Sequence, residues 1–167
     1  RAEKERQYLH NIADHLGVSV PTLHTVARST AKGLDREQLL TVVHHLWEGR
    51  DPPIYERRFV GVDLLANRAE LLAPDDLPLL IARVAGTQNP DEAAAAVKAV
   101  GAACQRMPDR EACAEQLAAA LSSSPVAAKC RFLEVLAAVG GTKALQTVAA
   151  AAKYNQPEMQ DTASRLL

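Results

Sequence analysis

The segment Asn89-Pro90-Asp91-Glu92-Ala93-Ala94-Ala95-Ala96 is a helix start of a kind that recurs along this chain of 167 residues. Proline fits the first turn of a helix, where its missing N–H breaks no hydrogen bond, and an asparagine before it can cap the free amides. Similar prolines, each followed by a helix-forming run, recur at steps of 32, 37, 35 and 32 residues: Pro21, Pro53, Pro90, Pro125 and Pro157. A unit of about 35 residues with two helices is typical of stacked helical repeats. The spacing therefore predicts an all-α helical-repeat solenoid.

Apolar periodicity and helix-end signals divide the chain into about ten helices, arranged in antiparallel pairs with short turns. The first five expected helices span residues 2–16, 21–32, a stretch after Asp35, 53 to about 72, and 75–85. The other five start at residues 90, 108, 125, just after 142, and 157. Four residues close to the helix-starting prolines are expected to cap helices: Asp51, Asn89, Ser124 and Asn155.

The composition predicts one continuous core, because 48% of the residues are apolar and 23% are charged. No apolar run approaches the roughly 20 residues that a membrane-spanning helix needs, so we expect a soluble, cytoplasmic protein that does not bind membranes. The chain starts at Arg1 without a methionine and stops at Leu167 directly after an apolar run, which indicates an excised or trimmed segment.

The composition changes between Arg83 and Asn89. All five histidines and the only tryptophan come before this break, and all three cysteines come after it. We expect a single solenoid over residues 1–167 with sub-regions 1–85 and 86–167. Two origins are compatible with the break: a natural solenoid with divergent repeats, or a fusion of two helical-repeat fragments. Alanine-rich helices can approach closely, so the junction need not be a linker.

The three cysteines lie at expected helix positions among alanines and leucines: Cys104, Cys113 and Cys130. Small thiols pack well in such surroundings, their number is odd, and no histidine lies beyond His45 to complete a metal site. The sequence therefore predicts buried free thiols and neither a disulfide nor a metal site.

Four pieces of sequence occur in a recognisable order between Tyr8 and about Leu80: Tyr8-Leu9, Leu16-Gly17-Val18-Ser19-Val20-Pro21, Leu46-Trp47, and Glu56-Arg57-Arg58 leading to Val62-Asp63-Leu64-Leu65. This stretch resembles the start of the AlkD-like DNA alkylation repair family. The resemblance implies a HEAT-like solenoid that grips duplex DNA in a basic concave groove and hydrolyses the N-glycosidic bond of positively charged alkylated bases. It also implies that Tyr8 is an aromatic near the lesion. Residues from about 87 to 167 are more similar to generic bacterial HEAT repeats of the interaction type.

In that family the chemistry is carried by a tryptophan-rich helix with an aspartate, followed by a later arginine and tryptophan. This chain contains no tryptophan beyond Trp47. A cationic base that leaves a sugar needs a carboxylate for the developing oxocarbenium charge and an aromatic wall for the cation. Asp91 and Asp109 are available carboxylates, but both lie in expected first turns of helices, where carboxylates satisfy free N–H groups. We therefore assign no catalytic residue, and the balance favours a protein that is not an enzyme.

Electrostatics limit the DNA hypothesis, because non-specific duplex binding depends on Lys and Arg neutralising phosphates. The net charge is −1, and residues 1–83 carry 11 basic against 12 acidic side chains. A local basic row is still possible. Besides Tyr8, the candidate binding residues are His24, Arg28 and Lys32 on the second helix and Arg57 and Arg58 on the fourth. The alternative is that these are ordinary solvated helix faces.

The sequence contains no phosphate-loop, metal or Ser-His-Asp motif, so we expect no metal, no nucleotide and no other cofactor. The first hypothesis is a non-catalytic recognition scaffold that binds a protein partner, or duplex DNA weakly and in a salt-dependent manner. The second is a DNA glycosylase for alkylated purines, or a fragment of one. The third is an engineered or fused repeat protein with no native ligand.

Overall fold

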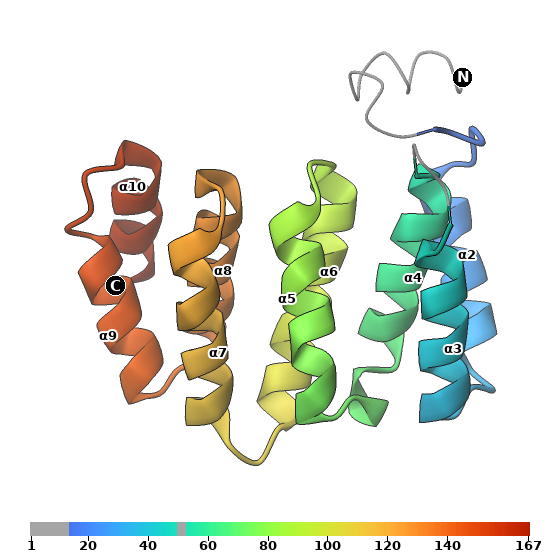
Figure 1. The fold of residues 1–167 in the computed structure, drawn as a ribbon, viewed down its shortest axis with the longest axis horizontal. Coiled ribbons are helices and arrows are strands. Elements are labelled where there is room, and N and C mark those ends of the chain that lie inside the picture. Colours follow the sequence, from blue (N-terminus) through green and yellow to red (C-terminus); the bar gives the residue numbers. More distant parts are fainter. Residues whose placement is uncertain (1–13, 50–52) are drawn as a thin grey trace.

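The computed structural model describes residues 14–49 and 53–167, and helices account for most of this part (Figure 1). The helices are α2 (Val20–Ala31), α3 (Arg36–Trp47), α4 (Tyr55–Asn67), α5 (Leu77–Gly86), α6 (Pro90–Arg106), α7 (Arg110–Ser123), α8 (Val126–Val139), α9 (Thr142–Ala151) and α10 (Pro157–Leu166), with short 3-10 turns at Ala69–Leu71 and Pro74–Asp76. Outside the helices, an isolated parallel β-bridge joins Asp14 to Ile54. The all-α prediction is confirmed.

The even-numbered helices begin at nearly equal intervals along the chain. Their first residues are separated by 35, 35, 36 and 31 positions: Val20, Tyr55, Pro90, Val126 and Pro157. Each of the first four is followed by an antiparallel helix, and the antiparallel helices that pack against each other include α3/α4, α5/α6 and α7/α8 (Figure 1). The proline period read from the sequence is therefore the period of a helical-repeat solenoid.

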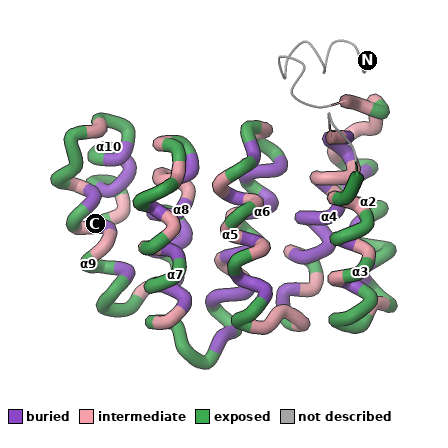
Figure 2. Tube along the Cα trace, in the orientation of Figure 1, coloured by how far each residue is buried: buried purple, intermediate pink, exposed green. Residues whose placement is uncertain are grey.

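The repeats stack into two layers. Successive even-numbered helices contact one another from α2 to α10, and we call these helices the even layer. In the second layer α5 contacts α7 and α7 contacts α9, and α3 packs on α4 at one end. Figure 2 shows that buried and exposed residues alternate along each helix, as amphipathic helices require.

One apolar core runs through the compositional break. It includes Leu65 and Leu80 before the break and Leu117 and Phe132 after it, all of them fully buried. Alanines of α6 allow this helix to pack closely against both α4 and α5. None of the described helices combines the length and the apolar character that crossing a bilayer requires.

Helix starts agree with the sequence at some positions and differ at others. Asn89 caps α6 as expected, because its Oδ1 accepts hydrogen bonds from the amides of Asp91 and Glu92, each 3.0 Å long. Ser124 does not cap α8; its hydroxyl donates to the carbonyl of Ala120 in the preceding helix (2.6 Å), and α8 begins after Pro125. The residue before α10 is Gln156, so the Asn155 cap was also wrong. The expected cap Asp51 lies outside the described residues.

Two predicted helices need comment. The first, 2–16, lies mostly outside the described residues, and its last three positions are not helical. The fourth was predicted to reach about residue 72, but α4 ends at Asn67. Arg68 leaves the helical conformation (φ −124°), and its guanidinium donates to the carbonyl of Ala31 (2.6 Å) at the end of α2. A contact between repeats therefore ends α4 early, and local periodicity does not reveal such a contact.

The prediction of three free thiols was wrong. Cys104 on α6 and Cys113 on α7 form a disulfide, with their Cα atoms 5.9 Å apart, and Cys130 is free and half-buried. The sequence argument treated each cysteine as a separate small apolar residue. The short turn between α6 and α7 brings two inward-facing positions, nine residues apart, opposite each other.

Candidate functional site

A hollow of about 220 Å³ lies on the even layer where α2, α4 and α6 meet. Its lining comes from these three helices: Val20 and His24 of α2, Phe59 and Asp63 of α4, and Asp91, Ala94, Ala95 and Lys98 of α6. Apart from the adjacent Ala94 and Ala95, the lining residues of each helix are three, four or seven positions apart, which keeps these side chains on one face. We call this feature the α2/α4/α6 hollow.

The central contact of the hollow joins His24 to Asp63. The imidazole Nδ1 lies 2.8 Å from Oδ2 of the carboxylate, and the two side chains are 46% and 6% exposed. The same imidazole meets the ring of Phe59 edge to face, with centroids 5.1 Å apart and planes at 71°. The histidine therefore covers the buried carboxylate and leaves its own outer edge in solvent.

A small apolar cluster seats α2 on α4. Leu23, Tyr55 and Phe59 are buried together, and Val18 and Val20 pack against them. Since Phe59 belongs both to this cluster and to the lining of the hollow, the packing of α2 fixes the position of His24.

Glu56 holds the segment that leads into α2. Its buried carboxylate accepts backbone N–H bonds from Leu16 (2.9 Å), Gly17 (2.8 Å) and Val18 (3.2 Å). Gly17 has φ +79°, a left-handed conformation that glycine adopts without strain and that turns consecutive amides toward one oxygen. The Leu-Gly-Val and Glu-Arg-Arg pieces of the sequence therefore contact each other in the fold.

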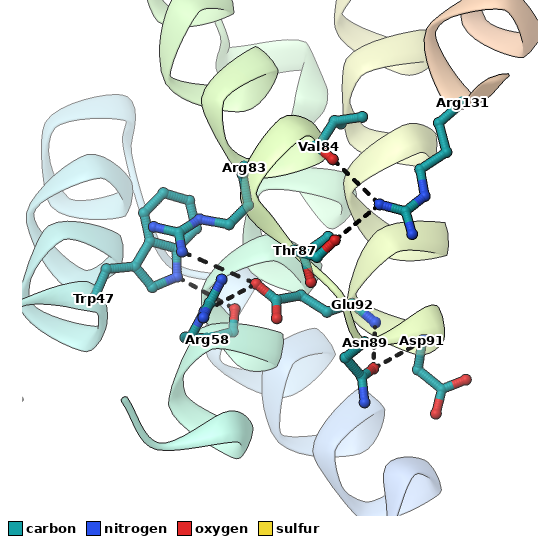
Figure 3. Close-up of polar contacts among 9 residues, drawn as sticks. All are labelled: Trp47, Arg58, Arg83, Val84, Thr87, Asn89, Asp91, Glu92 and Arg131. Carbon is teal, nitrogen blue, oxygen red and sulfur yellow. Dashed lines mark hydrogen bonds and ion pairs between the residues drawn. The ribbon is translucent and has the colours of Figure 1, made fainter. Parts of the chain in front are cut away.

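A second polar group lies between the layers and is drawn in Figure 3. We call it the Glu92 cluster; its members are Trp47, Arg58, Arg83 and Glu92. The buried carboxylate of Glu92 lies 3.2 Å from Nε of Arg58 and 4.0 Å from Nη1 of Arg83. The guanidinium of Arg83 lies over the indole of Trp47, 4.0 Å from the ring centroid. Burial and the positive charge of Arg58 lower the pKa of Arg83, and Glu92 partly offsets this.

The indole of Trp47 is fixed by α4. Its Nε1–H donates to the carbonyl of Arg58 (3.2 Å), and it lies directly against Gly61, where an added Cβ would be 2.2 Å from Nε1. Arg83 covers one face of this indole, and α4 contacts its N–H side. The Glu92 cluster therefore joins α3, α4, α5 and α6 and is not an open site.

The structure separates the predicted binding residues. His24 lines the hollow, and Arg28 and Lys32 are exposed further along α2. Arg57 donates to the carbonyl of His45 on α3, and Arg58 binds Glu92.

Arg57 and Arg58 of α4 therefore bind other groups of this protein, and they do not extend the row of basic side chains on α2. Tyr8 lies outside the described residues.

Of the lining residues, only His24 was a binding candidate from the sequence; those missed include Phe59, Asp63 and Lys98. Phe59 and Asp63 are four residues apart on α4, which is a usable signal for a shared face. Pairing them with His24 requires the register of α2 on α4, which the sequence does not supply.

Asp91 and Asp109, the two carboxylates that were assigned to helix N-termini, make different contacts. Asp109 caps α7, with its Oδ1 accepting from the amide of Ala112 (2.9 Å), as predicted. Asp91 lies in the first turn of α6, where Asn89 supplies the cap, and Asp91 also lines the hollow.

The chemistry available in the hollow is that of charge pairing. Asp63 already faces an imidazole, and the ring of Phe59 is 1% exposed, so it presents no open aromatic wall. Among the described residues, no group of three or more His, Cys, Asp or Glu side chains is arranged to hold a metal ion. The exposed groups at the rim are Asp91 and Lys98, which can pair with charges on a bound molecule.

The sequence profile of the family described as DNA alkylation repair enzyme matches residues 1–122, nearly three quarters of the chain. The match runs across the compositional break and includes α6 and most of α7. It therefore extends beyond the segment 8–80 that carried the resemblance in the sequence. Comparison with curated proteins and with solved structures finds no match.

Proposed function

Because the chain belongs to the DNA alkylation repair enzyme family, we propose that it is a non-catalytic member that binds a partner macromolecule on the even layer. The observation that carries the proposal is the state of the α2/α4/α6 hollow. Its buried carboxylate, Asp63, is covered by His24, and its aromatic ring, Phe59, is turned inward. Such a hollow recognises charge and shape but lacks the exposed groups that base excision needs.

The location of the tryptophan supports a binding role. Excision of a cationic base needs an aromatic face beside a carboxylate. The only tryptophan of the chain, Trp47, packs against Gly61 and under Arg83, and the carboxylate of the same cluster, Glu92, pairs with two arginines. These groups stabilise the stack of repeats instead of facing a substrate.

Base excision is the second candidate, because one observation favours it. The carboxylate of Asp63 and the ring of Phe59 line the same hollow, so a carboxylate and an aromatic are at least neighbours there. A movement of His24, which is 46% exposed, would uncover both groups. This candidate assigns Asp63 the role of stabilising the oxocarbenium charge.

Release of 7-methylguanine from N7-methylated duplex DNA distinguishes the two candidates. We expect no release above the uncatalysed rate, even with protein in large excess over DNA. Release that is abolished by Asp63→Asn but retained by Asp109→Asn would establish the enzyme and refute the scaffold. Asp109 is the matched control, because its carboxylate caps α7 and lies outside the hollow.

Duplex DNA is the first partner to test, given the family. Fluorescence anisotropy with a labelled 20-bp duplex should show weak binding that falls steeply with salt, if DNA is bound at all. Arg28→Glu, in the exposed row of α2, should weaken it further, whereas Arg165→Glu on α10 should not. Binding that is insensitive to salt and to Arg28→Glu would exclude a phosphate-binding role for this row.

Two further expectations stay predictions: a cytoplasmic location and a single solenoid over residues 1–167. Both origins of the change in composition near residue 86, divergent natural repeats or a fusion of two fragments, stay hypotheses. Cell fractionation tests the first. A single cooperative unfolding transition, monitored by helix content and by the fluorescence of Trp47, tests the second.

A further inference from the structure

The α2/α4/α6 hollow continues into two others across the even layer. A second hollow of about 380 Å³ lies between α6 and α8, and a third of about 520 Å³ lies between the α5–α6 turn and the start of α8. Ala94 lines both the first and the second, and Arg131 lines both the second and the third. Consecutive hollows therefore share a lining residue, and we call the three together, from α2 to α8, the transverse groove.

The floor of the transverse groove is made of small residues. The second and third hollows share an alanine-rich lining: Ala93, Ala94, Val97, Ala127 and Ala128. Small side chains allow a bound backbone to approach the helices closely. Neighbouring helices pack about 8–10 Å apart, so a groove across four of them is roughly 24–30 Å long. An extended polypeptide of about eight residues, at roughly 3.3 Å per residue, spans that length.

The charges along the groove are mixed in sign. From α2 toward α8 the ionisable side chains are His24 with Asp63, then Asp91 and Lys98, then Arg131 and Glu134. Arg131 is partly engaged, since its Nη1 donates to the carbonyls of Val84 (3.3 Å) and Thr87 (2.9 Å) in Figure 3. Three carboxylates therefore stand against two cations and one imidazole among the described residues of the groove.

This pattern does not suit a nucleic-acid backbone. A duplex presents one negative charge for about every 1.7 Å of its axis and needs a run of cations. The carboxylates of Asp91 and Glu134 are exposed in the groove and would repel phosphates. A polypeptide can place charges of either sign opposite them, so charge complementarity favours a peptide occupant.

We propose that the transverse groove binds an extended, mixed-charge polypeptide segment of a partner protein. An acidic side chain of the segment faces Lys98 and Arg131, and basic side chains face Asp91 and Glu134. This inference rests on the proposed recognition function and names the class of its partner. Duplex DNA is the competing occupant and is included in the test.

The probe is a random 12-residue peptide library displayed on phage and panned against the full chain. Selected peptides are synthesised with a fluorescent label, and their Kd is measured by anisotropy. Ala94→Arg blocks the point where two hollows join, and Ala119→Arg on α7 is the matched control, because both alanines are exposed on helices. We expect at least a tenfold rise in Kd with Ala94→Arg and no change with Ala119→Arg.

A charge reversal keeps the test decisive if Ala94→Arg disturbs folding. Lys98→Glu should raise the Kd of a selected peptide at least tenfold, and replacing an acidic residue of that peptide by Lys should restore binding.

Failure to select any peptide, or equal Kd values for wild type and both groove variants, would overturn the inference. So would a 20-bp duplex that displaces the peptides and itself loses affinity with Ala94→Arg. Release of 7-methylguanine would refute the proposal that the protein is non-catalytic. The effect of Ala94→Arg on the Kd of the peptides would still test the peptide-binding proposal separately.

Discussion

The guanidinium of Arg83 on α5 lies over the indole of Trp47 on α3, 4.0 Å from the ring centroid. The contact joins neighbouring repeats, and the indole depends in turn on α4, which offers the Arg58 carbonyl to its N–H and no side chain at Gly61. A cation–π pair in a partly desolvated setting contributes about 1–2 kcal/mol. Its surroundings lead to two predictions about stability.

Gly61→Ala should destabilise the fold by about 2–3 kcal/mol. The new Cβ would lie 2.2 Å from Nε1 of Trp47, and the indole has little freedom to move between α4 and Arg83. Gly101→Ala is the control, since nothing lies within 4 Å of an added Cβ there, in the middle of α6. That change should stabilise by about 0.5–1 kcal/mol. Urea unfolding followed by Trp47 fluorescence measures both, and equal effects would contradict the packing described here.

Glu92→Gln should reduce the free energy of unfolding by about 2–3 kcal/mol. It removes the negative charge that lies between Arg58 and Arg83 and leaves two largely buried cations facing each other. Asp161→Asn breaks an exposed i,i+4 pair with Arg165 and should change the stability by less than about 0.5 kcal/mol. Thermal melts of the two variants give the comparison. A loss for Glu92→Gln no larger than that of the control would show that the cluster contributes little.

Glu56→Gln should loosen the segment before α2. Oε1 of the carboxylate accepts three backbone amides, and glutamine replaces this charged acceptor by a neutral and weaker one, so we expect a loss of about 1–3 kcal/mol. Hydrogen exchange of the Leu16, Gly17 and Val18 amides should accelerate more than that of α8. Glu70→Gln, whose partner Arg68 is near the surface, should leave these amides unchanged.

Reduction of the Cys104–Cys113 disulfide should lower the free energy of unfolding by about 2.5–3 kcal/mol, the chain-entropy value for a loop of about ten residues. Cys130→Ser should change it by less than about 1 kcal/mol, because this thiol is half-buried and free. Titration of the unfolded, unreduced protein with a thiol reagent should find one reactive group. Three reactive groups would restore the prediction made from the sequence.

Much of the fold could be predicted from local signals in the sequence. Proline spacing, the Asn89 cap and the apolar period act within a few residues, and they gave the repeat length and most helix starts. The errors arose where a contact between repeats decides the outcome. Arg68 ends α4 by reaching Ala31, and the α6–α7 turn brings Cys104 to Cys113.

The hollow was less predictable than the fold. His24 was a candidate from the sequence, but its partner Asp63 lies 39 residues away and only the stacking of α2 on α4 joins them. Arg57 and Arg58 were placed in a binding row because of their charge, and their direction on α4 turns them toward His45 and Glu92 instead. Charge is visible in a sequence, whereas the direction of a side chain depends on the register between helices.

The position of Glu92 has a practical consequence for dividing this protein. It lies six residues beyond the end of α5, yet its two arginine partners precede the change in composition. An expression fragment that stops at residue 86 would keep both guanidinium groups without their counter-ion and would uncover the sides of α4 and α5 that α6 shields. Such a fragment should precipitate or unfold, whereas one that ends after α7, close to the last residue of the family match, retains the neutralising carboxylate.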